Sequence, residues 1–300
     1  MSRFTDMPVR QLVFFLLIAG WLTLVVSQPD WTTLASDFGG FGLLGVVGAI
    51  FANATGAGGG VIFVPFFNYL NFSALAIVAT SFAIQCCGMT AGALSWAAHA
   101  RQQTGMQWSP LRRGLLLTVP ASLCGIWLAQ YGADVTPGLA VLKGNLDNLH
   151  LGFGLFSVFL ALAIYGSVFV LHRVNNKTQV TLLDTLALPA IGFVGGIVTA
   201  WLSVGVGELV AVYLIIRGFN VTMSIALAVI LTACSVWGAI TYHLFVTGAI
   251  VTEVVLFAGA GAVVGGIVAR HVVLAFSARR LKLFFATWVL LMGLGSLPIY

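Results

Sequence analysis

The chain has 300 residues, of which 60% are hydrophobic and only 7% carry a charged side chain. Soluble domains contain about 25% charged residues, so this composition excludes an ordinary soluble protein and indicates a polytopic membrane protein. The formal charge of +5 does not indicate a nucleic-acid partner, because the few basic residues lie between apolar segments and form no basic stripe.

The N-terminal segment is predicted to be an uncleaved membrane span. Arg3 and Arg10 precede an apolar run, and no small-residue cleavage site follows it before Gln28. A single crossing of the hydrocarbon layer takes about 20 apolar residues. On this criterion the sequence predicts seven single spans, at 11–27, 74–98, 111–130, 149–171, 221–246, 250–269 and 283–297.

Two further regions, 38–67 and 186–216, are predicted to be broken helices. Each is too long for one span and is interrupted near its middle, by NATGAGGG at 53–60 and by SVGVG at 203–207. The part after each interruption is about ten residues long, too short to cross a membrane alone. Each region is therefore predicted to be a re-entrant hairpin or a pair of half-helices. Such backbone is tolerated at membrane depth only where it is buried in protein or lines a cavity.

The two broken regions are predicted to belong to an internal repeat. A constant offset of 147 residues relates Gly58 to Gly205, Gly60 to Gly207 and Cys87 to Cys234. Two pairs of glycines precede the breaks and are interpreted as helix-packing residues, namely Gly45 with Gly48 and Gly192 with Gly195. The predicted domains are an N-terminal helix with an outer link (1–37), repeat 1 (38–172), a cytoplasmic link (173–183) and repeat 2 (184–300).

Loop charge predicts the orientation. Cytoplasmic loops are enriched in Lys and Arg. A cytoplasmic N-terminus places all 13 basic residues except Lys143 on that side and leaves the C-terminus outside. Repeat 1 then begins outside and repeat 2 begins inside. The predicted fold is an all-α polytopic protein of a bacterial-type inner membrane, with two inverted repeats, a broken or re-entrant helix pair in each, and one extra N-terminal helix.

Inverted repeats that each contain a broken helix are typical of secondary transporters. The free N–H groups at the start of a second half-helix carry partial positive charge and attract an anion without a buried cation. No Lys or Arg lies near either break, so backbone and neutral groups are predicted to bind a small anionic substrate, with no enzymatic activity, cofactor or metal site. The predicted substrate-binding residues are Asn53, Thr55, Gly58, Gly59, Gly60, Gln85, Ser203, Gly205, Gly207, Thr232 and Ser235.

Glu208 is predicted to bind a coupling proton. It follows Gly207 directly, at the start of the second half-helix and deep inside an apolar segment. An ionisable group inside a membrane is costly, and the default hypothesis for it is a functional role. The alternative is a carboxylate that caps the second half-helix structurally.

Two other functions remain open at this stage. Cys87 and Cys234 are matched across the repeats and would suit a membrane thiol–disulfide electron carrier, although free Cys is commonly a small buried hydrophobe and no C-x-x-C motif occurs. A passive anion channel is the other alternative to a carrier.

The segment from Gly56 to Pro65 (GAGGGVIFVP), which follows Gly45 and Gly48, resembles the TauE/SafE family of sulfite-exporter-like permeases. In that family a glycine-rich stretch that leads to a proline recurs in each half of a duplicated membrane domain. The second copy here, from Ser203 to Glu208, lacks the proline. The resemblance covers about 38–297 and implies transport of sulfite, thiosulfate, sulfonates such as sulfoacetate, or other small organic anions.

Overall fold

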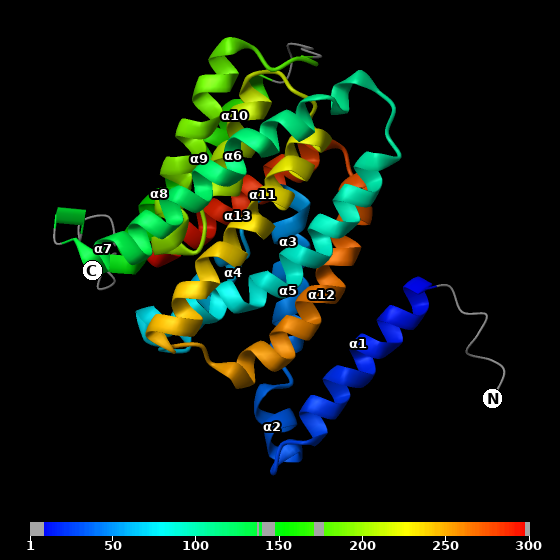
Figure 1. Cartoon of the computed structure of the whole chain (residues 1–300), viewed down its shortest axis with the longest axis vertical. Coiled ribbons are helices and arrows are strands. Elements are labelled where there is room, and N and C mark those ends of the chain that lie inside the picture. Colours follow the sequence, from blue (N-terminus) through cyan, green and yellow to red (C-terminus); the bar gives the residue numbers. More distant parts are fainter. Residues whose placement is uncertain (1–8, 137, 140–147, 171–176, 298–300) are drawn as a thin grey trace.

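A computed structural model describes residues 9–136, 138–139, 148–170 and 177–297, and these residues form a bundle of helices (Figure 1). The helices before the link between the halves are α1 (Val9–Val26), α2 (Trp31–Phe38), α3 (Phe41–Thr55), α4 (Gly60–Tyr69), α5 (Ala74–Arg101), α6 (Pro110–Trp127), α7 (Ala133–Val135) and α8 (Leu149–Val170). Those after it are α9 (Leu182–Leu202), α10 (Val206–Ile216), α11 (Val221–Tyr242), α12 (Thr252–Ala275) and α13 (Ala278–Ser296). Two π-helical turns, η2 (Leu128–Gly132) and η5 (His243–Thr247), extend α6 and α11.

All seven predicted single spans correspond to helices, with bounds that differ by a few residues. Within the described part of the chain, five helices are long and apolar enough to cross a membrane, and a sixth span results if the bent pair α2–α3 counts as one. An all-α polytopic membrane protein is therefore confirmed. Figure 1 shows α1 at the edge of the bundle, where the Trp21 indole N–H donates to the carbonyl of Leu256 on α12.

The helices around the breaks differ from the expected bounds in two respects. The outer link predicted up to residue 37 contains a short helix, α2, which meets α3 at a bend of 47°. Helix α9 is not a half-helix, because its 21 residues are span-length, and it begins at Leu182 rather than at 186. The reason for the early start is a capping box, in which the Thr181 N–H donates to the Asp184 carboxylate over 2.9 Å.

The two halves share the order of their broken helices and following spans, and some of the boundaries coincide. Adding 147 to the end of α3 gives the end of α9, and adding it to the start of α5 gives the start of α11. Each broken helix also packs against a span of the other half, because α3 lies along α12 and α9 lies along α6. A Cβ atom added to Gly45 would lie 1.9 Å from the carbonyl oxygen of Ala258 on α12, so the packing role predicted for this glycine is confirmed.

The membrane orientation and the inversion of the repeats stay predictions. Three basic residues used for the orientation, Arg3, Lys143 and Arg173, lie outside the described residues, as do the boundary at 172 and the first part of the predicted link at 173–183.

Candidate functional site

Both predicted breaks are present. Helix α3 ends at Thr55, Gly56 follows with φ +80°, and α4 begins four residues later. Helix α9 ends at Leu202, Ser203 and Gly205 follow with φ +58° and +146°, and α10 begins at the next residue. Glycine adopts positive φ at little cost, so Gly56 and Gly205 permit the chain to leave one helix and enter the next.

The two breaks lie against each other in the interior of the bundle. A Cβ atom added to Gly207 would lie 2.3 Å from the carbonyl oxygen of Gly56, and one added to Gly60 would lie 2.4 Å from the carbonyl oxygen of Ser203. Only residues without a side chain permit this approach of backbone to backbone. We call the region formed by residues 56–60 and 203–208 the junction.

Glu208 bridges the junction with its carboxylate. The side chain is 2% exposed. Its Oε1 accepts a hydrogen bond from the Gly58 N–H over 2.7 Å, and its Oε2 accepts one from the Gly205 N–H over 2.9 Å. Hydrogen bonds from N–H groups to a carboxylate are among the stronger ones in proteins. The carboxylate therefore occupies backbone N–H donors from both breaks. The sequence analysis predicted that these donors bind the substrate anion.

Gln85, from the middle of α5, joins the two breaks a second time. Its Oε1 accepts a hydrogen bond from the Gly59 N–H over 2.8 Å. Its Nε2 lies 3.2 Å from the carbonyl oxygen and 2.9 Å from the hydroxyl oxygen of Ser203. The Ser81 hydroxyl, one turn away on α5, accepts from the Gln85 amide and from the Ser203 hydroxyl. This side chain consequently fixes both breaks to one continuous helix.

Among the other predicted residues, Thr232 faces the junction, and its buried hydroxyl has no hydrogen-bond partner there. A Cβ atom added to Gly207 would lie 2.2 Å from this hydroxyl. Asn53 lies one turn before the break, and its amide nitrogen donates to the carbonyls of Ala49 and Gly88. Its Oδ1 is buried without a partner and lies against Gly92 of α5.

The last two predicted residues, Thr55 and Ser235, make hydrogen bonds that do not connect the two breaks. The Thr55 hydroxyl accepts from the Ala57 N–H and donates to the Phe51 carbonyl, so it caps the end of α3. The Ser235 hydroxyl lies 2.9 Å from that of Ser122 on α6 and donates to the Leu231 carbonyl, so its hydrogen bonds involve neither break.

The structure adds one junction residue that sequence reasoning missed. The Thr199 hydroxyl, in the last turn of α9, accepts from the Val206 N–H over 2.8 Å and so satisfies the first donor of α10. Nothing in the sequence distinguishes this threonine from the other hydroxyl residues of the apolar segments.

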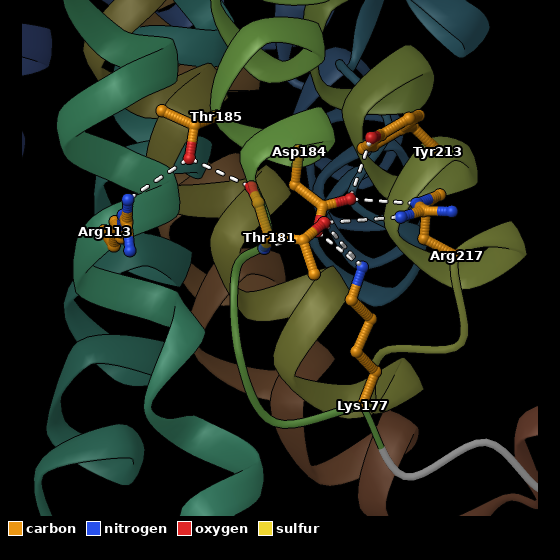
Figure 2. A network of polar contacts seen from close by, with 7 residues as sticks. All are labelled: Arg113, Lys177, Thr181, Asp184, Thr185, Tyr213 and Arg217. Carbon is orange, nitrogen blue, oxygen red and sulfur yellow. Dashed lines mark hydrogen bonds and ion pairs between the residues drawn. The ribbon is translucent and has the colours of Figure 1, made fainter.

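A second polar cluster holds the other end of the α9–α10 pair (Figure 2). Asp184, at the start of α9, is fully buried and accepts hydrogen bonds from Lys177, from Arg217 and Tyr213 at 2.9 Å each, and from Thr181. The hydrogen bond to Asp184 raises the pKa of Arg217. The end of α10 is thus fastened to the start of α9. The pattern Thr181-x-x-Asp184 before an apolar run is the capping-box signal that could have revealed this aspartate.

The matched cysteines are free thiols in different environments. Cys87 is half-buried, and a Cβ atom added to Gly259 of α12 would lie 3.1 Å from its sulfur, whereas Cys234 is exposed on the surface of the bundle. In the described part of the chain, no three His, Cys, Asp or Glu side chains lie close enough together to hold a metal ion.

Span-length apolar helices surround two broken helices whose breaks meet in the interior, and this is an architecture of membrane transport proteins. The model of the family described as "Sulfite exporter TauE/SafE" matches residues 41–296. The chain therefore belongs to the TauE/SafE family of membrane transporters, in agreement with the resemblance found in its glycine-rich segment. Neither the curated proteins nor the solved structures contained a match to the chain.

Proposed function

We propose that this protein is a secondary transporter that moves a small sulfur-containing oxyanion across a bacterial-type inner membrane by alternating access, coupled to protons. Sulfite, thiosulfate and organosulfonates such as sulfoacetate are the candidate substrates. The description of the family as a sulfite exporter supports this substrate class. The junction supports binding of an anion once Glu208 is protonated, because backbone N–H groups of both breaks and neutral side chains then remain there.

The observation that carries the proposal is the carboxylate of Glu208, which accepts from Gly58 and Gly205 at once. An oxyanion that uses these donors must compete with the carboxylate, and two negative groups in the same buried place repel each other strongly. Protonation removes the charge of Glu208 and weakens it as an acceptor, which frees both N–H groups. Proton binding and anion binding therefore favour each other, as cotransport of the two requires.

Neutral groups complete the proposed coordination of the oxyanion. The Thr232 hydroxyl has no partner and faces Gly207. The Gln85 amide and the Ser203 hydroxyl donate within the junction and are available to a ligand there once the breaks separate. In the conformation described here the two breaks touch, so access from either side of the membrane requires that one break moves away from the other.

The test is transport by the purified protein in proteoliposomes with an imposed pH gradient. We expect saturable uptake of at least one of sulfite, thiosulfate and sulfoacetate, with counterflow, and acceleration by the gradient. A flux that does not saturate and shows no counterflow would identify a passive anion channel and contradict the carrier mechanism.

Substitution of Gly59 by leucine tests the site. A Cβ atom at this position would lie 2.7 Å from the Phe63 ring and 2.9 Å from the Gln85 side chain, so Gly59→Leu is expected to abolish transport while the protein remains in the membrane. The matched control is Gly20→Leu on α1, where no atom lies within 4 Å of an added Cβ. Unchanged transport by Gly59→Leu would remove the junction from the substrate path.

Glu208→Gln tests the coupling. The amide keeps the shape of the protonated carboxyl group but cannot release a proton, so this variant is expected to exchange substrate while it loses the dependence on the pH gradient. A variant that the gradient still drives fully would remove Glu208 from the coupling.

A further inference from the structure

A small cavity lies about one helical turn from the junction, at the end of the bundle where α5 begins and where α6 and α11 end. It has a volume of about 30 Å³. Val78 lies three residues before Ser81 on α5, and Ala200 lies three residues before Ser203 on α9, which places these cavity residues one turn from the polar contacts of the junction. The lining residues are Leu75, Val78, Ala129, Gln130, Ala200, Tyr242 and His243.

Two buried polar atoms of the lining lack hydrogen-bond partners, Oε1 of Gln130 and Nε2 of His243. Their side chains belong to residues that are 4% and 3% exposed. The Gln130 amide nitrogen donates to the Ala239 carbonyl, which leaves Oε1 as the free acceptor. The Thr247 hydroxyl donates to the His243 carbonyl and lies 3.2 Å from the ring Nδ1. We assign the ring proton to Nδ1, since this hydroxyl can accept it, and this tautomer leaves Nε2 as an acceptor.

The pair of free acceptors defines the ligand that this cavity takes. A buried acceptor that remains unpaired is unfavourable, because it has lost its hydrogen bonds to water. A group with two hydrogens to donate removes both costs, whereas an anion would be repelled by two acceptors. A cavity of this volume holds one or two water molecules. The ligand is therefore water or its protonated form, and the sulfur oxyanion is excluded.

Repeat 1 indicates that the cavity is not a requirement of the fold. The offset of 147 relates Ala200 to Asn53 and His243 to Trp96. The Trp96 side chain is fully buried, and its indole N–H donates to the Asn53 carbonyl over 3.2 Å. In repeat 1 a buried indole that bonds the backbone of Asn53 thus occupies the position where His243 lines a cavity in repeat 2.

We propose that this cavity is the entry site for the coupling proton on the side of the membrane where α5 begins, which is the predicted outer side. The inference rests on the proton coupling proposed above. A hydronium ion in the cavity transfers one proton to Nε2 of His243 and remains as a water molecule, and the reverse step returns the proton. The site lies next to the junction without sharing any of the groups that hold the substrate.

Other titratable groups stand on the elements around His243. Tyr242 precedes it on α11, and the Tyr242 hydroxyl donates to the Asp134 carboxylate over 2.6 Å. The ring of Tyr131 in η2 packs edge-on against that of Tyr242. Helices α5 and α9 contribute only apolar side chains, including Phe82, whose ring stacks on the imidazole. His243 is therefore the one basic group among the lining residues.

The first test compares transport by His243→Gln and by the wild type when the pH is varied on one side only. We expect the wild-type rate to change with the outer pH and the variant to respond less than about twofold over the same range, while both respond to the inner pH. The control is His99→Gln, at the opposite end of α5, with a wild-type response expected. A wild-type outer-pH profile for His243→Gln, or a wild-type rate that does not depend on the outer pH, would overturn the inference.

The second test does not depend on transport. In a high-resolution experimental structure, we expect density for a water about 3 Å from both Gln130 Oε1 and His243 Nε2, and loss of this density in Gln130→Leu. A dry cavity in the wild type would overturn the inference whatever the transport assay gives. A hydrated cavity in a protein that transports no sulfur oxyanion would instead contradict the proposed function.

Discussion

The two breaks begin with a left-handed residue at equivalent positions, Gly56 and Ser203, but differ in how their outer ends are anchored. In repeat 2, one helix of 21 residues leads to the break, and Asp184 joins the end of α10 to the start of α9. In repeat 1, the leading arm bends by 47° between α2 and α3. Asp37 occupies the position equivalent to Asp184, and it accepts a hydrogen bond from its neighbour Ser36.

The difference corresponds to the residues at the positions that supply the partners of Asp184. The positions equivalent to Tyr213 and Arg217 are Phe66 and Leu70, which offer no polar group. A charged group that is buried with several donors holds its elements in one arrangement, whereas apolar contacts permit more movement. The comparison teaches that the two halves share the breaks and not their anchors. We therefore expect α3 and α4 to move during transport while α9 and α10 stay fixed.

The largest effect is expected where the breaks touch. In Gly207→Ala, the added Cβ atom would meet the Thr232 hydroxyl at 2.2 Å and the Gly56 carbonyl at 2.3 Å, so the breaks must separate. We expect transport to fall more than tenfold and the free energy of unfolding to fall by about 3 kcal/mol. Transport in proteoliposomes and thermal unfolding in detergent measure these changes. A fully active Gly207→Ala protein would mean that the breaks need not touch.

The anchors are compared directly by Asp184→Asn and Asp37→Asn. Loss of the charge of Asp184 weakens its ion pairs with Lys177 and Arg217, which are partly exposed, and is expected to cost about 2 kcal/mol of unfolding free energy. The matched change at Asp37 is expected to cost less than about 0.5 kcal/mol. Thermal unfolding of both variants gives the comparison, and equal losses of stability would refute the difference in anchoring.

A smaller effect is expected where α11 passes the junction. Thr232→Val removes a hydroxyl that faces the junction, and Ser235→Ala removes one that bonds Ser122 on α6. One neutral hydrogen bond contributes about 0.5–1.5 kcal/mol, so the KM for the substrate should rise about two- to tenfold in the first variant and stay within twofold in the second. The reverse order would place the substrate on the α6 side of α11.

The smallest effect is expected for the matched thiols. Because Cys87 is half-buried beside Gly259 of α12 and Cys234 is exposed on the surface of the bundle, the double change to serine should leave anion transport within about twofold of the wild type. The measurement is the same proteoliposome assay. Loss of all activity in the double variant would favour the thiol–disulfide electron carrier over the anion transporter.

The sequence was sufficient to predict the positions of both breaks and the burial of Glu208. Consecutive glycines inside an apolar segment indicate a break in the helix. A carboxyl group directly after such a break lies deep in an apolar segment and is therefore expected to be buried. The same reasoning predicted that Gln85 and Thr232 face the breaks, because the offset of 147 residues relates the two positions. These predictions depend on local pattern and on duplication, both of which a single sequence contains.

What the sequence did not reveal depends on contacts between distant segments. The partners of Asp184 come from two segments of the chain, 177–181 and 213–217, and nothing local marks Tyr213 and Arg217 as its donors. Ser235 follows Thr232 by three residues, which turns its side chain by about 60° around the helix. This rotation is enough to direct Ser235 to α6 instead of the junction, and only the packing of α11 decides it.

The central claim is that Glu208 and the substrate compete for the same backbone donors. Calorimetric titration of the purified protein with a sulfonate that stays ionised throughout, repeated in buffers of different ionisation enthalpy, counts the protons taken up with the anion. The account predicts that proton uptake per anion bound by the wild type approaches one at alkaline pH, where Glu208 is ionised before binding, and is zero for Glu208→Gln, with affinity that rises as the pH falls only in the wild type. Anion binding without proton uptake in the wild type, or equal uptake in both proteins, would contradict it.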